Sequence, residues 1–389
     1  MGRHEGKVVF VPYALPGEEV EVEVVKERKD YIQARLLGVL YPSPDRAEPP
    51  CPYFGICGGC QWQHISYRAQ LAFKESILWS QLKRLGGIPD PPVRQALGME
   101  EPWHYRNHLQ FHIAEEGALG FMAAGSRRVI PIEECHLPHP LMEDILASLN
   151  LEWPGLKCLS ARVGANTGEG MLIFETWDDE PFELEVDIPV SCVFLLSDGR
   201  SATLIGNEHI HERLAGRIYR ISAGSFFQVN TEQAEELVRQ VAVCLAPEGE
   251  EVLLDAYCGV GVFGLSLSGQ VGRVIGVEEN PTALADARIN AADVENVEFI
   301  EGKVEEMLPA LEQHVDLAVI DPPRTGCAPE AFIKLAPKKI AYVSCDPATL
   351  ARDVRVFCAA GYELLEVQPI DLFPQTYHIE SVSLLVRKK

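Results

Sequence analysis

Five short apolar runs, separated by helical stretches, constrain the fold of the second half of this chain more than any other feature. They are Val252–Leu254, Val274–Val277, Val297–Ile300, Leu317–Ile320 and Ile340–Val343. Apart from Glu298, these runs contain no charged side chain, and such runs indicate strands buried on both faces, as in a parallel sheet covered by helices. From residue 226 to residue 389 we therefore predict an α/β domain with a doubly wound, Rossmann-like sheet.

A glycine-rich segment after the first of these runs indicates the cofactor. Asp255, Gly259 and Gly261 form an acid-x-x-x-Gly-x-Gly pattern where the strand turns into a helix, and Glu278 ends the next strand. Glycines let a backbone approach a ligand closely, and an acid at that strand end accepts hydrogen bonds from ribose hydroxyls. The glycine spacing of dinucleotide sites is absent. The pattern is typical of S-adenosylmethionine sites, although a structural strand-to-helix turn is the alternative.

A second motif follows the fourth run, at the edge where doubly wound folds bind ligands. It reads Asp321-Pro322-Pro323-Arg324. A similar Asp-Pro-Pro-Tyr element in amino-methyltransferases positions an exocyclic amine, but here an arginine replaces the aromatic residue. We expect Asp321 to hydrogen-bond a pyrimidine edge or the methyl donor.

A cysteine and a glutamate near the end of this domain suit methylation of uracil at carbon 5. Cys345 lies within Ser-Cys-Asp-Pro, and Glu380 lies within His-Ile-Glu. Carbon 5 attacks a methyl donor only after a thiolate has added at carbon 6, and a base must then remove the carbon-5 proton. We expect both side chains on loops that follow late strands. A single cysteine also fits a buried, small apolar role.

A cation is expected to lower the pKa of the Cys345 thiol. Arg324 and Arg352 are the candidates, unless they pair with Asp321 or Asp353.

Length and composition set broader limits. The 389 residues suffice for two or three domains, and 47% hydrophobic residues allow a sizeable core. There is neither a long apolar run nor a signal sequence, so we expect a cytoplasmic protein with no membrane span. The net charge of −23 argues against a nucleic-acid partner, but a whole-chain sum says nothing of one face.

Two further regions precede the α/β domain. Residues 1–42 alternate apolar and polar side chains around a Pro16-Gly17 turn, which predicts a small antiparallel, barrel-like β-module. A proline-rich connector follows. Residues 43–225 form a β-rich central region whose helix, residues 66–86, is expected to pack on the C-terminal domain.

Several motifs together resemble those of the RNA uracil-5 methyltransferase family, and they occur in the family's order. They are Phe226-Phe227-Gln228-Val229-Asn230, Asp255 to Gly264, Asp321 to Arg324, Ser344 to Asp353, and His378-Ile379-Glu380. The resemblance covers nearly the whole chain. It implies that Cys345 is the nucleophile and Glu380 the proton acceptor. It also implies that Gln228, Tyr257, Glu278 and Asp321 contact the methyl donor or the base.

A cysteine cluster lies in the central region. Cys51, Cys57 and Cys60 are closely spaced, and Cys135 is a plausible fourth member. Four cysteines bind either zinc or an iron–sulfur cluster, and spacing alone does not decide between them. The subfamily that this chain resembles holds a 4Fe–4S cluster with the same four cysteines. The resemblance therefore favours the cluster, in a structural and RNA-contacting role.

The resemblance also implies an RNA partner. Residues 1–42 look like the RNA-binding module called TRAM, with a shortened or absent first strand. Trp103 to Asn107 resembles an element near the substrate, although core packing explains Trp103 and Tyr105 equally well. The expected substrate is a single-stranded uridine in 23S ribosomal RNA, with transfer RNA as the alternative, and we expect a monomer.

Two other classes of protein were weighed against this interpretation. An RNA-binding relative without activity is disfavoured by the presence of both Cys345 and Glu380. A DNA cytosine-5 methyltransferase would carry its nucleophile in a Pro-Cys pair near the cofactor loop, whereas here the cysteine follows a serine and lies much later.

Overall fold

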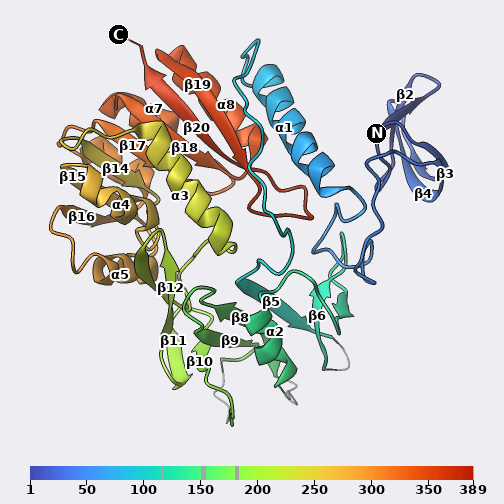
Figure 1. The fold of residues 1–389 in the computed structure, drawn as a ribbon, viewed down its shortest axis with the longest axis horizontal. Helices are drawn as coiled ribbons and strands as arrows, with labels where there is room; N and C mark the ends of the chain where they lie inside the picture. The colour runs from blue at the N-terminus through green and yellow to red at the C-terminus, as the bar shows by residue number, and fades with distance from the viewer. Residues whose placement is uncertain (115–116, 150–154, 180–183, 389) are drawn as a thin grey trace.

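A computed structural model describes residues 1–114, 117–149, 155–179 and 184–388. Figure 1 shows a C-terminal sheet flanked by helices, a middle sheet below it, and a small N-terminal sheet that stands apart. No helix in the described ranges is long and apolar enough to cross a membrane. The predicted divisions at residues 42 and 225 stay predictions; the nearest strands end at Tyr41 and Ser222.

The N-terminal sheet has four strands in the order β1-β2-β4-β3. Their bounds are β1 (Gly2–His4), β2 (Lys7–Phe10), β3 (Glu19–Glu27) and β4 (Tyr31–Tyr41). The first strand is present but has only three residues. The prediction of an antiparallel module is wrong for one pair of strands. β4 lies between β2 and β3 and pairs antiparallel with β3, but it pairs parallel with β2. Its small core contains Val9, Ile32 and Ala34.

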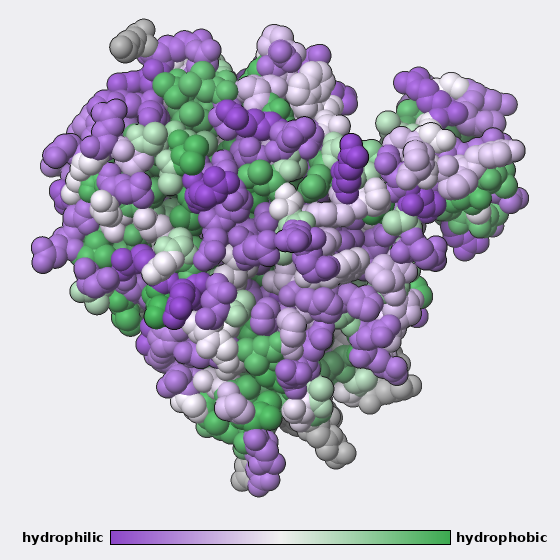
Figure 2. Space-filling view, viewed as in Figure 1, coloured by the Kyte–Doolittle hydropathy of each residue, from purple (hydrophilic) through white to green (hydrophobic). Residues whose placement is uncertain are grey.

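Hydrophobic side chains remain exposed on this N-terminal sheet. Val24, Val25 and Leu37 are each more than half exposed. In Figure 2 hydrophobic patches on this sheet lie beside hydrophilic side chains, which cover most of the face in view. The module therefore presents both apolar and charged side chains to solvent.

The middle region is a helix followed by a seven-stranded sheet and a hairpin. The sheet has the order β11-β10-β9-β8-β5-β6-β7, and β12 pairs with β13. The elements are α1 (Tyr67–Arg84), β5 (His108–Ile113), β6 (Leu119–Met122), β7 (Val129–Pro131), α2 (Pro140–Ala147), β8 (Leu156–Val163), β9 (Gly170–Thr176), β10 (Ser191–Leu195), β11 (Ser201–Ile205), β12 (His209–Leu214) and β13 (Arg217–Ser222). Met142 and Ile145 of α2 pack on the core of this sheet.

The C-terminal sheet has the order β16-β15-β14-β17-β18-β20-β19, in which only β20 is antiparallel to its neighbours. Its strands are β14 (Val252–Ala256), β15 (Arg273–Glu278), β16 (Val297–Glu301), β17 (Leu317–Ile320), β18 (Lys339–Ser344), β19 (Tyr362–Ile370) and β20 (Glu380–Arg387). Its helices are α3 (Thr231–Leu245), α4 (Val262–Leu267), α5 (Pro281–Asn290), α6 (Val304–Met307), α7 (Pro329–Leu335) and α8 (Pro347–Ala359), with 3₁₀ turns η1 (Ser268–Gln270) and η2 (Leu308–Ala310). The predicted doubly wound α/β domain is confirmed.

Each face of this sheet carries its own core, because alternate side chains of a strand point to opposite faces. Leu253 of β14 packs with Val241 of α3 on one face. Leu254 packs on the other face, in a core that also contains Leu78 and Leu82 of α1. Helix α1 therefore lies on the C-terminal sheet, beside α8 (Figure 1).

Candidate active site

Four of the predicted site residues gather at one edge of the C-terminal sheet. Tyr257 follows β14, Glu278 ends β15, Asp321 follows β17 and Cys345 follows β18. These strands are parallel, so their carboxyl ends share an edge. Glu380 joins them because β20 runs in the opposite direction and begins where the others end.

The register of β18 and β20 brings the cysteine and the glutamate together. Ser344 pairs with Ser381, so one further step of the antiparallel register places Cys345 opposite Glu380. Cys345 is partly exposed, whereas Glu380 is only 4% exposed. The expectation that Glu380 lies on a loop after a strand is wrong, since it is the first residue of β20.

A small cavity at the same edge is lined by Gln228, Tyr257 and Asp321. Gln228 reaches it from the segment before α3, where Asn107 donates a hydrogen bond to the Gln228 carbonyl at 3.0 Å. Glu278 lies beside the cavity, because its carboxylate accepts the amide of Gly259, a lining residue, at 2.9 Å. The four predicted cofactor residues thus surround one site.

The glycine-rich loop is held in shape by a buried carboxylate. Asp255 is 1% exposed, and its Oδ2 accepts the amide of Gly264 at 2.7 Å. A Cβ at Gly264 would lie 2.9 Å from that oxygen, so only glycine fits there. Tyr257 adopts a positive φ of 62°, and its hydroxyl donates to Glu305 at 2.5 Å. These contacts fix the loop beside the cavity that Tyr257 and Gly259 line.

The site is rich in acids whose pKa values are raised. Burial, and then the charge of Asp255, raise the pKa of Asp321 to about 7. Burial also raises the pKa of Asp255 to about 7, with a further contribution from Glu278. Burial, followed by Asp321, raises the pKa of Glu380 well above its usual range. Acids packed against one another in this way favour a positively charged ligand.

The thiol of Cys345 does not have the lowered pKa that we expected. Burial, then the charges of Glu380 and Asp321, raise its pKa to about 11, and the opposing effect of Arg324 is smaller. Arg352 takes no part, because it pairs with Asp353 at 2.7 Å and donates to the Thr325 carbonyl. Without substrate, the cysteine is therefore a protonated thiol.

The four clustered cysteines line a second cavity, of about 560 Å³. They are Cys51, Cys57, Cys60 and Cys135. Burial, and then the neighbouring thiols, raise the pKa of Cys60 to about 12. Within the described ranges, no three His, Cys, Asp or Glu side chains converge closely enough to hold a metal ion. The thiols thus surround a space instead of converging on one point.

Unpaired donors at this cavity suit a bound anion. Arg106 Nε and His136 Nε2 are buried without a hydrogen-bond partner, and both residues line the cavity. A cluster held by four thiolates carries its cysteines on separate irons and accepts hydrogen bonds at sulfur. The residues present therefore fit such a group, although Arg106 and His136 were not singled out in the sequence for this purpose.

The aromatic residues near this cavity pack mainly against protein. Tyr105 is 6% exposed, and its hydroxyl donates to the Pro374 carbonyl at 3.2 Å. Trp103 lies edge-on to His136. For Tyr105, the core-packing alternative describes the structure better than base stacking.

Comparison with known proteins decides the family. Residues 197–388 match the family model described as tRNA (Uracil-5-)-methyltransferase, and residues 1–37 match the TRAM domain. An uncharacterized RNA methyltransferase of Halalkalibacterium halodurans is 39% identical over 99% of this chain and 93% of its own length. The chain belongs to the tRNA (uracil-5-)-methyltransferase family.

Other members agree over the same length. A relative from Clostridium tetani, also described as an uncharacterized RNA methyltransferase, is 37% identical over 99% of this chain and 93% of its own. Among solved structures, the Pyrococcus abyssi tRNA (uracil-54, C5)-methyltransferase in complex with S-adenosyl-L-homocysteine has a TM-score of 0.76 and 28% identity. That match covers 98% of this chain and 96% of the other. The protein is thus an S-adenosylmethionine-dependent RNA methyltransferase with an N-terminal TRAM domain.

The raised pKa of Asp321 predicts a pH-dependent effect of Asp321→Asn in this methyltransferase. An aspartate of pKa 3.8 when unfolded and about 7 when folded binds more protons in the folded state, so stability falls as pH rises between these values. Relative to the wild-type protein at the same pH, the asparagine variant should therefore gain more in melting temperature at pH 8 than at pH 5. Its affinity for S-adenosylmethionine should fall about 10- to 100-fold, as after loss of a charged hydrogen bond.

Thermal melts at both pH values and titration calorimetry with S-adenosylmethionine check these expectations. Asp316→Asn is the control, since Asp316 lies at the opposite end of the same strand and its pKa is lowered. Equal gains in melting temperature at pH 5 and pH 8 would contradict the assigned burial effect.

Proposed function

We propose that this protein methylates carbon 5 of a uridine in RNA through a covalent bond between Cys345 and carbon 6, with 23S ribosomal RNA as the first candidate substrate. The strand register that faces Cys345 with Glu380, beside a cavity lined by predicted cofactor residues, carries the proposal. A nucleophile and a base on adjacent strands reach the same face of one pyrimidine ring.

The proposed reaction balances as follows. The Cys345 thiol and the Glu380 carboxyl group first release their protons to solvent. The Cys345 sulfur then adds to carbon 6, and the electron pair moves onto carbon 4 oxygen as an enolate. Carbon 5 of the enolate attacks the methyl group of S-adenosylmethionine, and the sulfonium–methyl bond breaks to release S-adenosylhomocysteine. Glu380 then accepts the carbon-5 proton, and the carbon–sulfur bond breaks to release 5-methyluridine and the thiolate.

The electrostatics of the site suit both halves of this reaction. Asp255, Glu278 and Asp321 are acidic residues at this site, and a bound sulfonium would favour the ionised forms of Asp255 and Asp321, whose pKa values are raised in its absence. Because its pKa is raised, the Glu380 carboxylate is a stronger base than an exposed glutamate once it has ionised. Arg324 is the cation whose charge lowers the pKa of Cys345, and we assign it the stabilisation of the thiolate.

Labelled methyl transfer tests the reaction and the substrate together. The protein is incubated with methyl-labelled S-adenosylmethionine and, separately, unmodified 23S ribosomal RNA and transfer RNA transcripts, and the labelled nucleoside is identified after digestion. Labelled 5-methyluridine from one RNA is the expected result. Label in another nucleoside, or in neither RNA while the donor is bound, contradicts the proposal.

Transfer RNA is the second candidate substrate. The solved structure that supports it is the Pyrococcus abyssi tRNA (uracil-54, C5)-methyltransferase, which resembles this chain over nearly its full length. Label in transfer RNA alone would favour this candidate and leave the chemistry unchanged.

We further propose that Cys51, Cys57, Cys60 and Cys135 hold a 4Fe–4S cluster. The shared cavity and the unpaired Arg106 and His136 nitrogens support it. Protein purified without oxygen should be brown and contain about four irons per chain. Cys60→Ala should lose most of this iron, whereas Cys244→Ala, a buried thiol on α3, should retain it. Stoichiometric zinc without iron would contradict the assignment.

A further inference from the structure

The loop that leads to Glu380 is held by residues outside the C-terminal sheet. We name residues 371–379, between β19 and β20, the base loop. We propose that Lys74 and Asp371 are positioning residues that hold the base loop, and through it Glu380, for removal of the carbon-5 proton. This inference rests on the proposed function of Glu380.

A buried ion pair anchors the start of the base loop. Lys74 Nζ of α1 lies 2.5 Å from Asp371 Oδ1, and it also donates to the Phe373 carbonyl at 3.1 Å. The two side chains are 2% and 0% exposed. Removing charges from water offsets most of the attraction between them, so such pairs add little net stability. A role in fixing one loop geometry explains this pair better than a role in stability.

A second anchor holds the middle of the base loop. Gln70, one turn before Lys74 on α1, donates from Nε2 to Gln375 Oε1 at 2.9 Å and accepts the Gln375 amide at 3.0 Å. The amides of Gln61 and Trp62 both donate to the Gln375 carbonyl. Gln375 has a φ of 68°, which side-chain-bearing residues seldom adopt. The surrounding contacts therefore hold the loop in a conformation that its own sequence disfavours.

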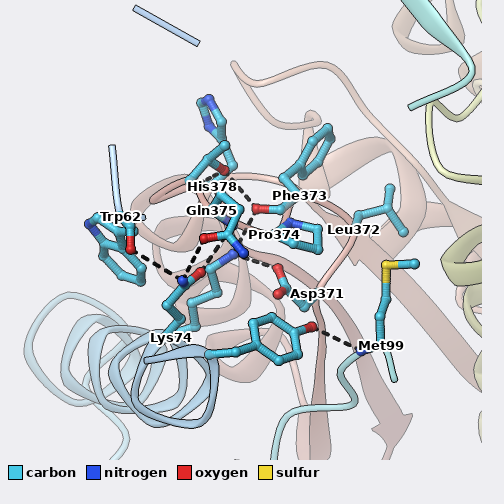
Figure 3. Close-up of polar contacts among 12 residues, drawn as sticks. Trp62, Lys74, Met99, Asp371, Leu372, Phe373, Pro374, Gln375 and His378 are labelled. Atoms are coloured by element: carbon cyan, nitrogen blue, oxygen red, sulfur yellow. Dashed lines mark hydrogen bonds and ion pairs between the residues drawn. The ribbon is translucent and has the colours of Figure 1, made fainter. Parts of the chain in front are cut away.

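Two more segments complete the anchorage. Tyr105 donates to the Pro374 carbonyl, and Asn230 donates to the Leu372 carbonyl at 3.2 Å. Figure 3 shows Lys74, Asp371 and Gln375 converging, with Trp62 and Met99 at the sides. The base loop thus rests on α1 and on segments at residues 61–62, 105 and 230. Each of these is distant from it in sequence.

The anchors hold the base loop and not the nucleophile. Cys345 lies between β18 and α8, and none of the hydrogen bonds and ion pairs described above involves it. Loosening the base loop should therefore spare the addition of sulfur to carbon 6 and slow the later proton transfer, which requires close alignment. The expected signature is a methylated RNA that stays bound to Cys345.

Three variants test the inference in the full-length protein. Lys74→Met and Asp371→Asn each remove one charge of the ion pair. Gln375→Gly removes the side-chain hydrogen bond to Gln70 and frees the backbone at the positive φ, without leaving a buried charge unpaired. Each is mixed with methyl-labelled S-adenosylmethionine and the RNA that the wild type methylates, and adduct and free product are followed over time on denaturing gels. We expect adduct to form at the wild-type rate and product release to slow about 10- to 100-fold.

Two reference variants make the result decisive. Glu380→Gln shows how much adduct accumulates when the base is lost. Leu385→Ala changes a core residue of the same strand, β20, and shows the effect of general destabilisation. Variants that release product at the wild-type rate, or that lose adduct formation and turnover equally as Leu385→Ala does, would overturn the inference. If Lys74→Met does not fold, Gln375→Gly decides. Absence of adduct with Glu380→Gln would instead refute the proposed function itself.

Discussion

Cys345→Ala is expected to abolish methylation and all covalent attachment to RNA. Without the sulfur, carbon 5 of uracil stays too weakly nucleophilic to take up a methyl group, so the loss should be on the order of 10⁴-fold or more. The side chain is partly exposed at the edge of the sheet, so its truncation should cost little stability. Transfer of labelled methyl groups and denaturing gels of labelled RNA provide the two measurements.

The control for this variant is Cys358→Ala. Cys358 is also a partly exposed thiol, but it lies near the C-terminal end of α8, whereas Cys345 lies just before the N-terminal end of that helix. It should methylate and form adduct as the wild type does. Normal activity in Cys345→Ala would show that the nucleophile has been assigned wrongly.

Glu380→Gln is expected to trap the methylated RNA on the enzyme. An amide of the same shape does not take up the carbon-5 proton, so sulfur addition and methyl transfer proceed while release slows by about 10²- to 10⁴-fold. The substitution should not harm folding. The raised pKa of Glu380 means that its ionisation opposes the folded state as pH rises, and glutamine removes that effect.

A gel-shifted, denaturant-resistant species carrying both RNA and labelled methyl is the measurement for Glu380→Gln. Glu363→Gln is a matched control, because Glu363 lies on the neighbouring strand β19 with an exposed side chain. Release at the wild-type rate in Glu380→Gln would assign the base to another residue, and Asp321 would then be the nearest acid to test.

Much of the C-terminal sheet was predictable because its signals are local. Each of the five predicted runs lies within one strand from β14 to β18. β14, β15, β17 and β18 lie inside the sheet, and a strand buried on both faces must be apolar at nearly every position, whereas the edge strand β16 is only partly buried and carries Glu298 and Glu301. Strands β19 and β20 were not predicted. Tyr362–Ile370 and Glu380–Arg387 mix charged and apolar residues, and the two strands pair antiparallel with each other at one end of the sheet.

The candidate site was also predictable only in part. The residue types that the chemistry requires stand in short motifs, so Cys345, Glu380 and the glycine-rich loop could be proposed as site residues from sequence alone. Their electrostatic state could not, because it depends on burial and on distant charges. The expected low pKa of Cys345 is wrong for this reason: burial, and then the charges of Glu380 and Asp321, outweigh Arg324 once the strands are assembled.

By itself the sequence determined the kinds of groups available to this protein: a thiol, a carboxylate, a donor-binding loop and four clustered cysteines. Only the tertiary structure decided how they are placed. Cys345 faces Glu380 through the register of two strands, and Lys74 meets Asp371 although 297 residues separate them along the chain. Local motifs reflect the conformation and chemistry of neighbouring residues. Registers and buried ion pairs instead depend on the packing of the whole chain, which no single segment encodes.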